Sequence, residues 1–312
     1  MSAKTGTNSG MISGSVLKIV AVVTMLIDHI AHGYLYRAFY LGHFLPGMDA
    51  QAAEEFYRLC RHIGRIAFPI YCFLLVEGFF HTRNRFRYAG ALALFAAVSE
   101  VFFDLALTIW VNPEDFTPLL VLQQNPNTAN GSQNVFWTLL IGLCVIWCMD
   151  ITERLFMQGR GRKDSLHTLR LALTSLSYVA IAFLGCYIAD KFNTDYRYWG
   201  VLMIVLFYVL AKNRFAQAIV PYVLLCMVPF LFVEPPFLQD VFDAILRAIP
   251  VAWQERITPW ATEVYAFPSF FLILLYNGKR GFLKSNPVLK YAFYAFYPLH
   301  LAAIYLVRIL IL

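Results

Sequence analysis

Nine long apolar runs limit what this sequence can fold into. The runs are continuous rather than alternating, which is typical of membrane-spanning helices and not of a β-barrel. Of the residues, 60% are hydrophobic and 14% are charged, whereas a soluble domain has about 25% charged residues. The sequence therefore predicts an all-α fold, a polytopic membrane helix bundle. The nine predicted transmembrane helices cover about residues 16–37, 62–80, 88–110, 134–153, 167–189, 197–211, 215–233, 262–277 and 290–312.

The basic residues predict how this bundle is oriented. With the N-terminus in the cytosol, the cytosolic segments hold about twice as many Lys and Arg residues as the outer segments, which favours an N-in, C-out topology. Residues 1–15, which begin with a stretch rich in Ser, Gly and Thr, are expected to be a disordered cytosolic tail. Residues 16–312 are expected to be a single transmembrane domain. Within it, apolar residues at helical spacing predict one interfacial amphipathic helix at 238–260.

Ionisable side chains inside the apolar runs are the candidate catalytic residues. Asp28 and His29 lie in the first run, Glu100 in the third and His300 in the last. A charged side chain at such a depth costs about 2.5–3.5 kcal/mol. A neutral imidazole can take a proton from a nucleophile and later return one, so His29 is the predicted base, oriented by Glu100 or His300. The alternatives are a polar network that only fixes helix packing, and haem ligation by the two histidines.

Nearer the outer side, four further polar residues are candidates for binding a substrate. Asp28 and His32 are one helical turn apart, so the carboxylate could orient that imidazole. Arg65 and Asp104 have matching depth on neighbouring runs, which makes an ion pair plausible. Asn134 begins the fourth run, where it could contact a substrate or only cap the helix.

Basic residues also gather at the predicted cytosolic ends of the runs, namely Lys18, Arg83, Lys279 and Arg280. The last two lie in a turn with two glycines, which let backbone N–H groups approach a phosphate. This pattern predicts a mouth for an anionic, phosphate-bearing cofactor; ordinary positive-inside anchoring is the alternative. No metal site is expected, since there is no CxxC and no HExxH, and no nucleic-acid-reading motif is present.

Several blocks of sequence resemble one known family. They are LKI (17–19) with LIDHI (26–30), RHIGRIAFPI (61–70) with FLLVEGFFHTRN (73–84), SE (99–100) with FD (103–104), QNVF (133–136) with TL (138–139), YNGKRG (276–281), and FY (293–294) with FYPLHL (296–301). In this order they resemble the TraX family, named for the inner-membrane protein that N-acetylates conjugative F-type pilin. The resemblance implies a multi-pass protein of the bacterial inner membrane.

A more distant similarity is to integral-membrane acyltransferases that O-acylate cell-surface sugars. Those enzymes carry Arg-x10-His in their first helix, and Lys18 and His29 reproduce the spacing with Lys in place of Arg. The similarity implies that Lys18 helps to hold the acyl-CoA phosphates and that His29 is the catalytic base. A helix spans about 16 Å over this interval, which is about the length of a pantetheine arm.

Together these features predict an integral-membrane acetyltransferase that uses cytosolic acetyl-CoA as co-substrate. The acceptor would be an amine or hydroxyl, such as a peptide N-terminus, a sugar or a small amine. Asn134 or Tyr297 could stabilise the thioester oxyanion. The expected partners are this acceptor and membrane lipids, and no nucleic acid.

Two other classes of function stay open from the sequence. A proton-coupled transporter of a small ionic substrate could use Asp28, Glu100 and Asp104 as a proton relay. The odd number of runs and the lack of internal repeats count against it. The other alternative is a non-catalytic membrane chaperone.

Overall fold

The computed structural model describes residues 10–108, 132–157, 166–233, 251, 256–282 and 287–311. Over these residues the fold is all-α, with no β-strand and two isolated β-bridges. Most of the predicted interfacial helix at 238–260 lies outside the described residues. The elements are α1 (Gly14–Ile30), η1 (Ala31–Leu35), α2 (Tyr36–Tyr40), α3 (Ala50–Gly64), α4 (Ala67–His81), α5 (Arg85–Phe103), η2 (Asp104–Thr108), α7 (Val135–Met157), α8 (His167–Lys191), α9 (Arg197–Val209), α10 (Arg214–Pro221), η4 (Tyr222–Met227), α11 (Val228–Leu231), η5 (Thr258–Ala266), α14 (Phe267–Leu274) and α15 (Pro287–Ile311).

Seven helices in the described part of the chain are long and apolar enough to cross a membrane, so the protein is a multi-pass membrane protein. The predicted count of nine and the N-in orientation stay predictions. Helix α9 has 13 residues and reaches about 20 Å, less than the roughly 30 Å of a hydrocarbon core. The predicted run at 262–277 is divided between η5 and α14. The seven helices are Gly14–Tyr40, Ala50–His81, Arg85–Leu107, Val135–Met157, His167–Lys191, Arg214–Leu231 and Ala292–Ile311.

Helix α3 begins well before the predicted second run at 62–80. Its N-cap is Asp49, whose carboxylate accepts a hydrogen bond of 2.8 Å from the Ala52 N–H. Exposed polar residues such as Glu54 and Arg58 give this helix one polar face, so a search for apolar runs does not find it. The helix packs along α1 and carries two arginines to the middle of the molecule.

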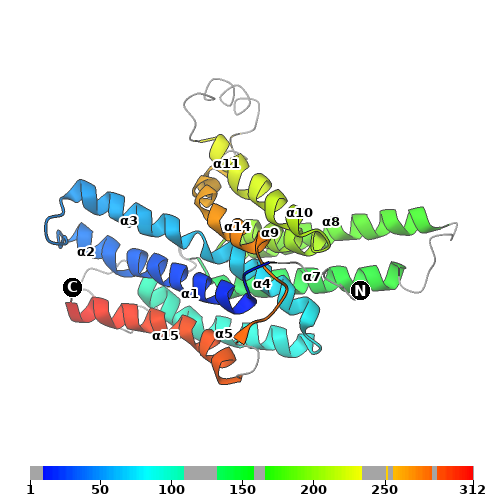
Figure 1. The fold of residues 1–312 in the computed structure, drawn as a ribbon, viewed down its shortest axis with the longest axis horizontal. Coiled ribbons are helices and arrows are strands. Elements are labelled where there is room, and N and C mark those ends of the chain that lie inside the picture. The colour runs from blue at the N-terminus through cyan, green and yellow to red at the C-terminus, as the bar shows by residue number, and fades with distance from the viewer. Residues whose placement is uncertain are drawn as a thin grey trace.

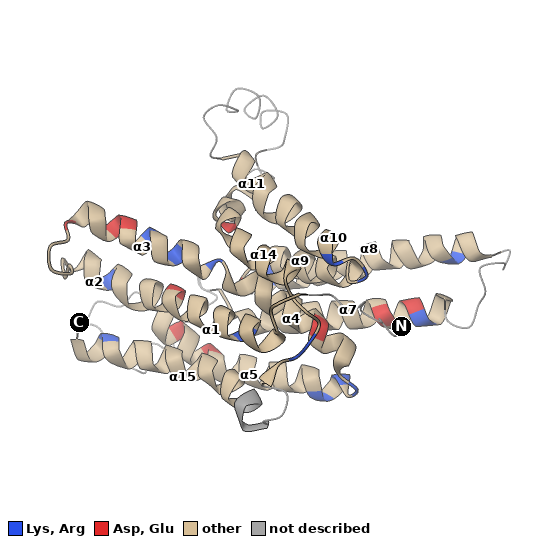
Figure 2. Cartoon of the chain, in the orientation of Figure 1, with Lys and Arg blue, Asp and Glu red and all other residues tan. Residues whose placement is uncertain are grey.

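The helices form two groups that extend in opposite directions from a shared centre (Figure 1). Helices α1, α3, α5 and α15 extend to one side, α7 and α8 to the other, and α4, α9 and α14 lie between. Charged residues are absent from long stretches of these helices and gather at helix ends and near the centre (Figure 2). The largest fully buried side chains include Phe73, Phe79, Leu143, Ile146 and Phe207, which join α4, α7 and α9 into one core.

Residues 10–13 of the predicted tail run beside the turn that follows α14. The Ile12 N–H donates to the Leu275 carbonyl at 3.2 Å, and the Asn277 N–H donates to the Ile12 carbonyl at 2.9 Å. The Gly14 N–H, at the start of α1, donates to the Lys279 carbonyl at 2.9 Å. The first turn of α1 is therefore tied to the glycine-containing turn at 276–281.

Gly200 tests the packing of α9 on α4 and α7. A Cβ at this position would lie 2.5 Å from Cγ2 of Thr138 on α7 and 2.7 Å from Cζ of Phe68 on α4, closer than real Cβ contacts. We expect Gly200→Ala to lower the free energy of unfolding by about 1–3 kcal/mol, the usual cost of overpacking. Gly90→Ala is the control, because a Cβ there meets no described atom within 4 Å. Thermal unfolding in detergent measures both; equal midpoints would contradict this packing.

Candidate functional site

Two histidines from the first and last helices meet near the centre of the bundle. Nδ1 of His29 on α1 lies 2.7 Å from Nε2 of His300 on α15. The two rings are stacked, with centroids 5.0 Å apart and planes 9° from parallel. Tyr297 presents its ring edge-on to both histidines. Of the two predicted partners of His29, Glu100 and His300, the structure places His300 in contact with it.

The hydrogen bonds of this pair assign a tautomer to each ring. Nδ1 of His300 lies 2.8 Å from the Phe296 carbonyl oxygen, which can only accept, so this nitrogen carries the proton. In a neutral ring, Nε2 of His300 is then an acceptor, and Nδ1 of His29 must donate to it. The lone pair of neutral His29 is therefore on Nε2, the nitrogen that a general base uses.

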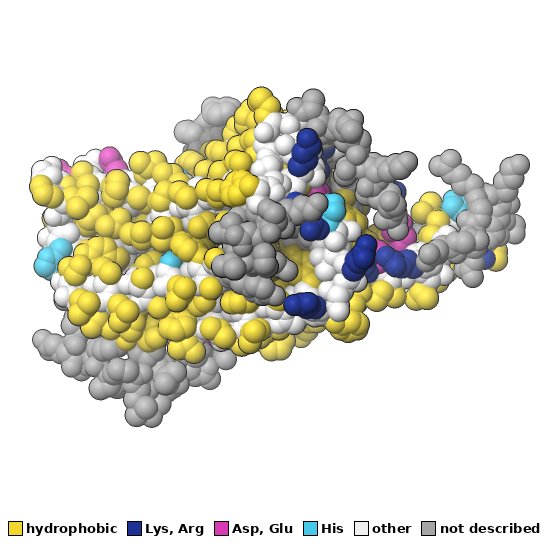
Figure 3. Space-filling view, turned by 60° about the horizontal axis from the view of Figure 1, so that its bottom comes forward, with side chains coloured by type: hydrophobic (Ala, Val, Ile, Leu, Met, Phe, Trp, Pro, Cys, Tyr) yellow, Lys and Arg dark blue, Asp and Glu magenta, His cyan; other side chains and the backbone are white. Residues whose placement is uncertain are grey.

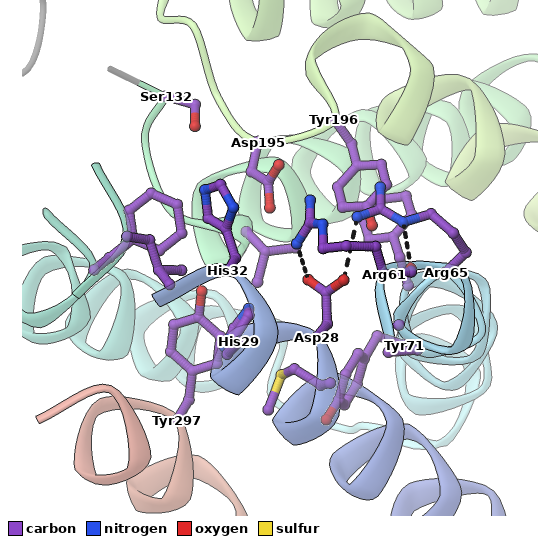
Figure 4. Close-up of a pocket in the computed structure, with 17 residues that line it drawn as sticks. Asp28, His29, His32, Arg61, Arg65, Tyr71, Ser132, Asp195, Tyr196 and Tyr297 are labelled. Atoms are coloured by element: carbon purple, nitrogen blue, oxygen red, sulfur yellow. Dashed lines mark hydrogen bonds and ion pairs between the residues drawn. The ribbon is translucent and has the colours of Figure 1, made fainter. Parts of the chain in front are cut away.

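His29 lines a cavity of about 180 Å³ at this point (Figure 4). An engineered protein cavity of about 150 Å³ binds benzene, so this space is large enough for a small organic group. Tyr297 lies beside His29 in Figure 4, and its hydroxyl is buried with no hydrogen bond inside the described part of the chain. The polar residues that line the cavity are Asp28, His29, His32, Arg61, Arg65, Tyr71, Ser132, Asp195, Tyr196 and Tyr297.

Two arginines at the C-terminal end of α3, Arg61 within the helix and Arg65 as its C-cap, neutralise the carboxylate of Asp28. Arg61 lies 2.6 Å and Arg65 lies 3.4 Å from its oxygens. Arg65 also holds Glu263 of η5 at 2.9 Å, and the side chains of this second pair are 15% and 4% exposed. Gly64 permits the approach of α3, because a Cβ there would overlap the Asp28 carboxylate. The network joins α1, α3 and η5 with two positive and two negative charges.

These ion pairs replace two that the sequence predicted. Asp28 does not orient His32, since its oxygens face Arg61 and Arg65 and His32 lies 3.3 Å from the Tyr57 hydroxyl instead. The π-helical segment η1 begins just before His32 and changes the regular one-turn spacing from Asp28. Arg65 pairs with Glu263 and Asp28, and forms no ion pair with Asp104. Asp104 starts another π-helical segment, η2.

Glu100 likewise faces another partner than the one predicted. Its Oε2 accepts hydrogen bonds from the side chain and the backbone N–H of Asn134, and from Nε1 of Trp137 at 2.9 Å. It therefore fixes the start of α7, and the group that contacts His29 is His300. Asn134 also donates to the Ala96 carbonyl at 2.8 Å and accepts from the Phe136 N–H. Its amide is thus engaged in holding α5 to α7, and a role as oxyanion donor has no support from this geometry.

The loop between α8 and α9 adds an acidic group that the sequence analysis did not single out. Gln133 forms a parallel bridge with Thr194, and its carbonyl accepts from the Asp195 N–H at 2.7 Å. Thr138 donates to the Asp195 carbonyl. Tyr196 has a left-handed backbone, with φ of 61°, and stacks on Phe68 at 3.6 Å. A non-glycine residue held in this conformation needs strong support from its surroundings. The loop therefore holds Asp195 at the cavity wall.

The predicted phosphate-binding residues gather at one end of α1. Ser15, one turn before Lys18, donates to the Arg280 carbonyl at 2.8 Å. The Arg280 side chain donates to the His81 carbonyl at 3.3 Å, which brings the loop containing Arg83 alongside. Lys279, Arg280 and Arg83 are exposed. Lys and Arg also gather beside a broad apolar area in the space-filling view (Figure 3).

Comparison with known proteins finds one family and one relative that match nearly the whole chain. A model described as TraX protein matches residues 13–308. The chain is 26% identical over 289 residues to a protein of Dichelobacter nodosus described as "Probable fimbrial assembly protein FimC, serogroup H1", across 92% of this chain and 91% of that relative. No solved structure matches the chain.

Arg65 tests the buried charge network. We expect Arg65→Met to lower the free energy of unfolding by about 3–5 kcal/mol, because it leaves Glu263 and Asp28 short of a counter-charge. Adding Glu263→Gln should restore part of the loss. Arg58→Met is the control, since its ion pair with Glu54 is 62% exposed on both sides and is worth about 1 kcal/mol at most. Equal losses at positions 58 and 65 in thermal unfolding would refute the network's importance.

Proposed function

This chain belongs to the TraX family, and on that basis we propose that it is an acyltransferase of the bacterial inner membrane that moves an acetyl group from acetyl-CoA to an amine or hydroxyl acceptor. The observation that carries the proposal is the His29–His300 pair, whose hydrogen bonds leave Nε2 of His29 with a lone pair, on a residue that lines the cavity. General-base catalysis needs a neutral imidazole in this state.

The chemistry assigned to His29 is proton transfer during attack on a thioester. The acceptor's nitrogen or oxygen attacks the carbonyl carbon while Nε2 of His29 takes its proton. The carbon–sulfur bond then breaks, and the imidazolium returns the proton to the leaving sulfur. His300 accepts a hydrogen bond from Nδ1–H of His29 throughout, which stabilises the positive ring. The Tyr297 hydroxyl is the candidate donor to the thioester oxygen, because it is buried here without a partner among the described residues.

The basic residues at the end of α1 fit the phosphates of a CoA thioester. Lys18 and His29 lie on one uninterrupted helix, and eleven residues make three turns plus about 20°, so the two side chains share a face. Their separation of about 16 Å matches a pantetheine arm. The nucleotide would then lie at the basic end, with Lys279, Arg280 and Arg83 nearby.

The description of the relative and the chemistry of the site both favour one class of acceptor. The relative's description as a fimbrial assembly protein favours a pilin-type polypeptide, and a polypeptide N-terminus is an amine. The transporter alternative has less support, because Asp28, the first member of its proton relay, is held by two arginines.

His29 is the decisive residue for the proposed reaction. We expect His29→Ala to lower acetyl transfer by roughly 100- to 10,000-fold, the usual contribution of a general base. His300→Ala should cause a smaller loss, because it removes only the partner that sets the tautomer. His43→Ala is the control, since that histidine is exposed. Purified protein and labelled acetyl-CoA give the measurement, and wild-type turnover by His29→Ala would exclude the residue as base.

The basic end of α1 should control donor affinity. We expect Lys279→Ala with Arg280→Ala to raise the KM for acetyl-CoA about tenfold or more while kcat changes little, since charge-assisted contacts contribute about 1.5–3 kcal/mol each. Arg58→Ala is the control, because it removes an exposed charge on α3. An unchanged KM in the double variant would place the phosphates elsewhere.

A further inference from the structure

Asp195 is a carboxylate at the cavity that forms no ion pair with any residue the structure describes, although Arg61 and Arg65 lie near enough to influence it. Its side chain points into the pocket between His32 and Arg61 (Figure 4). The hydrogen bonds given for Asp195 in the described residues are those of its backbone. By contrast, Asp28 and Glu263 are matched by the two arginines of the ion network. Asp28, Glu263 and Asp195 thus outnumber Arg61 and Arg65 by one negative charge in the cavity wall and the ion network beside it, which favours a cationic ligand.

An amine acceptor presents two protons that the site must remove. An α-amino group has an ordinary pKa of about 7.7–8.0 and arrives largely as an ammonium. One proton must leave before the nitrogen can attack, and a second leaves as the new bond to carbon forms. His29 can take only one of them, because it has a single lone pair on Nε2. A second proton acceptor in contact with the same nitrogen would let the site bind the abundant ammonium form directly and remove its first proton there.

We propose that Asp195 binds the ammonium group of the acceptor and takes its first proton, and this rests on the proposed acetyl transfer. The carboxylate becomes a carboxylic acid and the ammonium becomes a neutral amine. The amine attacks the thioester carbonyl, His29 takes the second proton, and the departing sulfur receives that proton from His29. Asp195 then releases its proton to water. In sum, an ammonium and a thioester give an amide, a thiol and one free proton.

The surroundings of Asp195 suit this role. Burial raises the pKa of Asp195 to about 6, while the Arg65 and Arg61 guanidinium groups act to lower it. The carboxylate is therefore mostly ionised at pH 7 and can still accept a proton from a bound ammonium. The titratable groups around it are Asp28 and His32 near the middle of the first helix, Arg61 on α3 and Arg65 just after it, Tyr71 on α4, Tyr196 in the same loop, Glu263 on η5 and Tyr297 on α15.

The test compares a short peptide that has a free N-terminal amine with the same peptide in which a hydroxyl replaces that amine. We expect Asp195→Asn to raise the KM for the amine peptide by about ten- to a hundredfold, as for loss of a charge-assisted contact. The KM for the hydroxyl peptide should change much less, because that acceptor brings no ammonium to bind. In the wild type, transfer to the amine peptide should fall as the pH drops through about 6, and Asp195→Asn should lack this step.

Asp190→Asn is the matched control, since Asp190 at the end of α8 pairs with Arg256 at 3.6 Å. Thermal unfolding reports whether Asp195→Asn folds; if it does not, the wild-type pH profiles of the two peptides decide the question, because only the amine profile should show the step. An unchanged KM and pH profile for the amine peptide would overturn the role of Asp195 while leaving acetyl transfer intact. Absence of transfer to either peptide by the wild type would refute the proposed function, and the role of Asp195 with it.

Discussion

Arg65 makes the centre of this bundle possible, because it lies between two buried carboxylates on different elements. Ionised groups in an apolar interior are tolerated only when they are paired. With Arg61, it neutralises Asp28 and Glu263 and ties α3 to α1 and η5. The cavity beside His29 depends on this balance, since Asp28, Arg61 and Arg65 form part of its wall. Arg61 and Arg65 form their ion pairs with Asp28 and Glu263, and not with Asp195.

The tautomer of His29 is set by residues near the C-terminal end of the sequence. The Phe296 carbonyl on α15 fixes the proton of His300, and His300 in turn fixes the proton of His29. A backbone carbonyl cannot donate, so the direction of the whole chain of hydrogen bonds has one solution when both rings are neutral. The packing of α15 against α1 therefore also determines which nitrogen of His29 carries the proton.

Much of this arrangement could be predicted from the sequence, because depth in a membrane follows from position along an apolar run. Depth alone predicts that His29 lies level with His300, and that Lys18 lies level with the basic turn at 276–281. It could not predict which side chains face each other, since this depends on how each helix is rotated about its axis. Arg65 therefore met Glu263 instead of Asp104. Asp195 lies in a loop whose left-handed backbone is built without glycine, so no residue type signals it. Helix α3 was also missed, because its polar face interrupts the apolar pattern used to find membrane-spanning helices.

The uninterrupted course of α1 has one more consequence. Lys18 and His29 belong to the same rigid rod, so neither can approach the other when a donor is bound. A thioester carried on a much shorter or longer arm would present its carbonyl above or below the imidazole. If the chain uses such a donor, the length of α1 between Lys18 and His29 would set which carrier arm fits. The enzyme would then select its donor by the length of that arm, independently of the acyl group that it transfers.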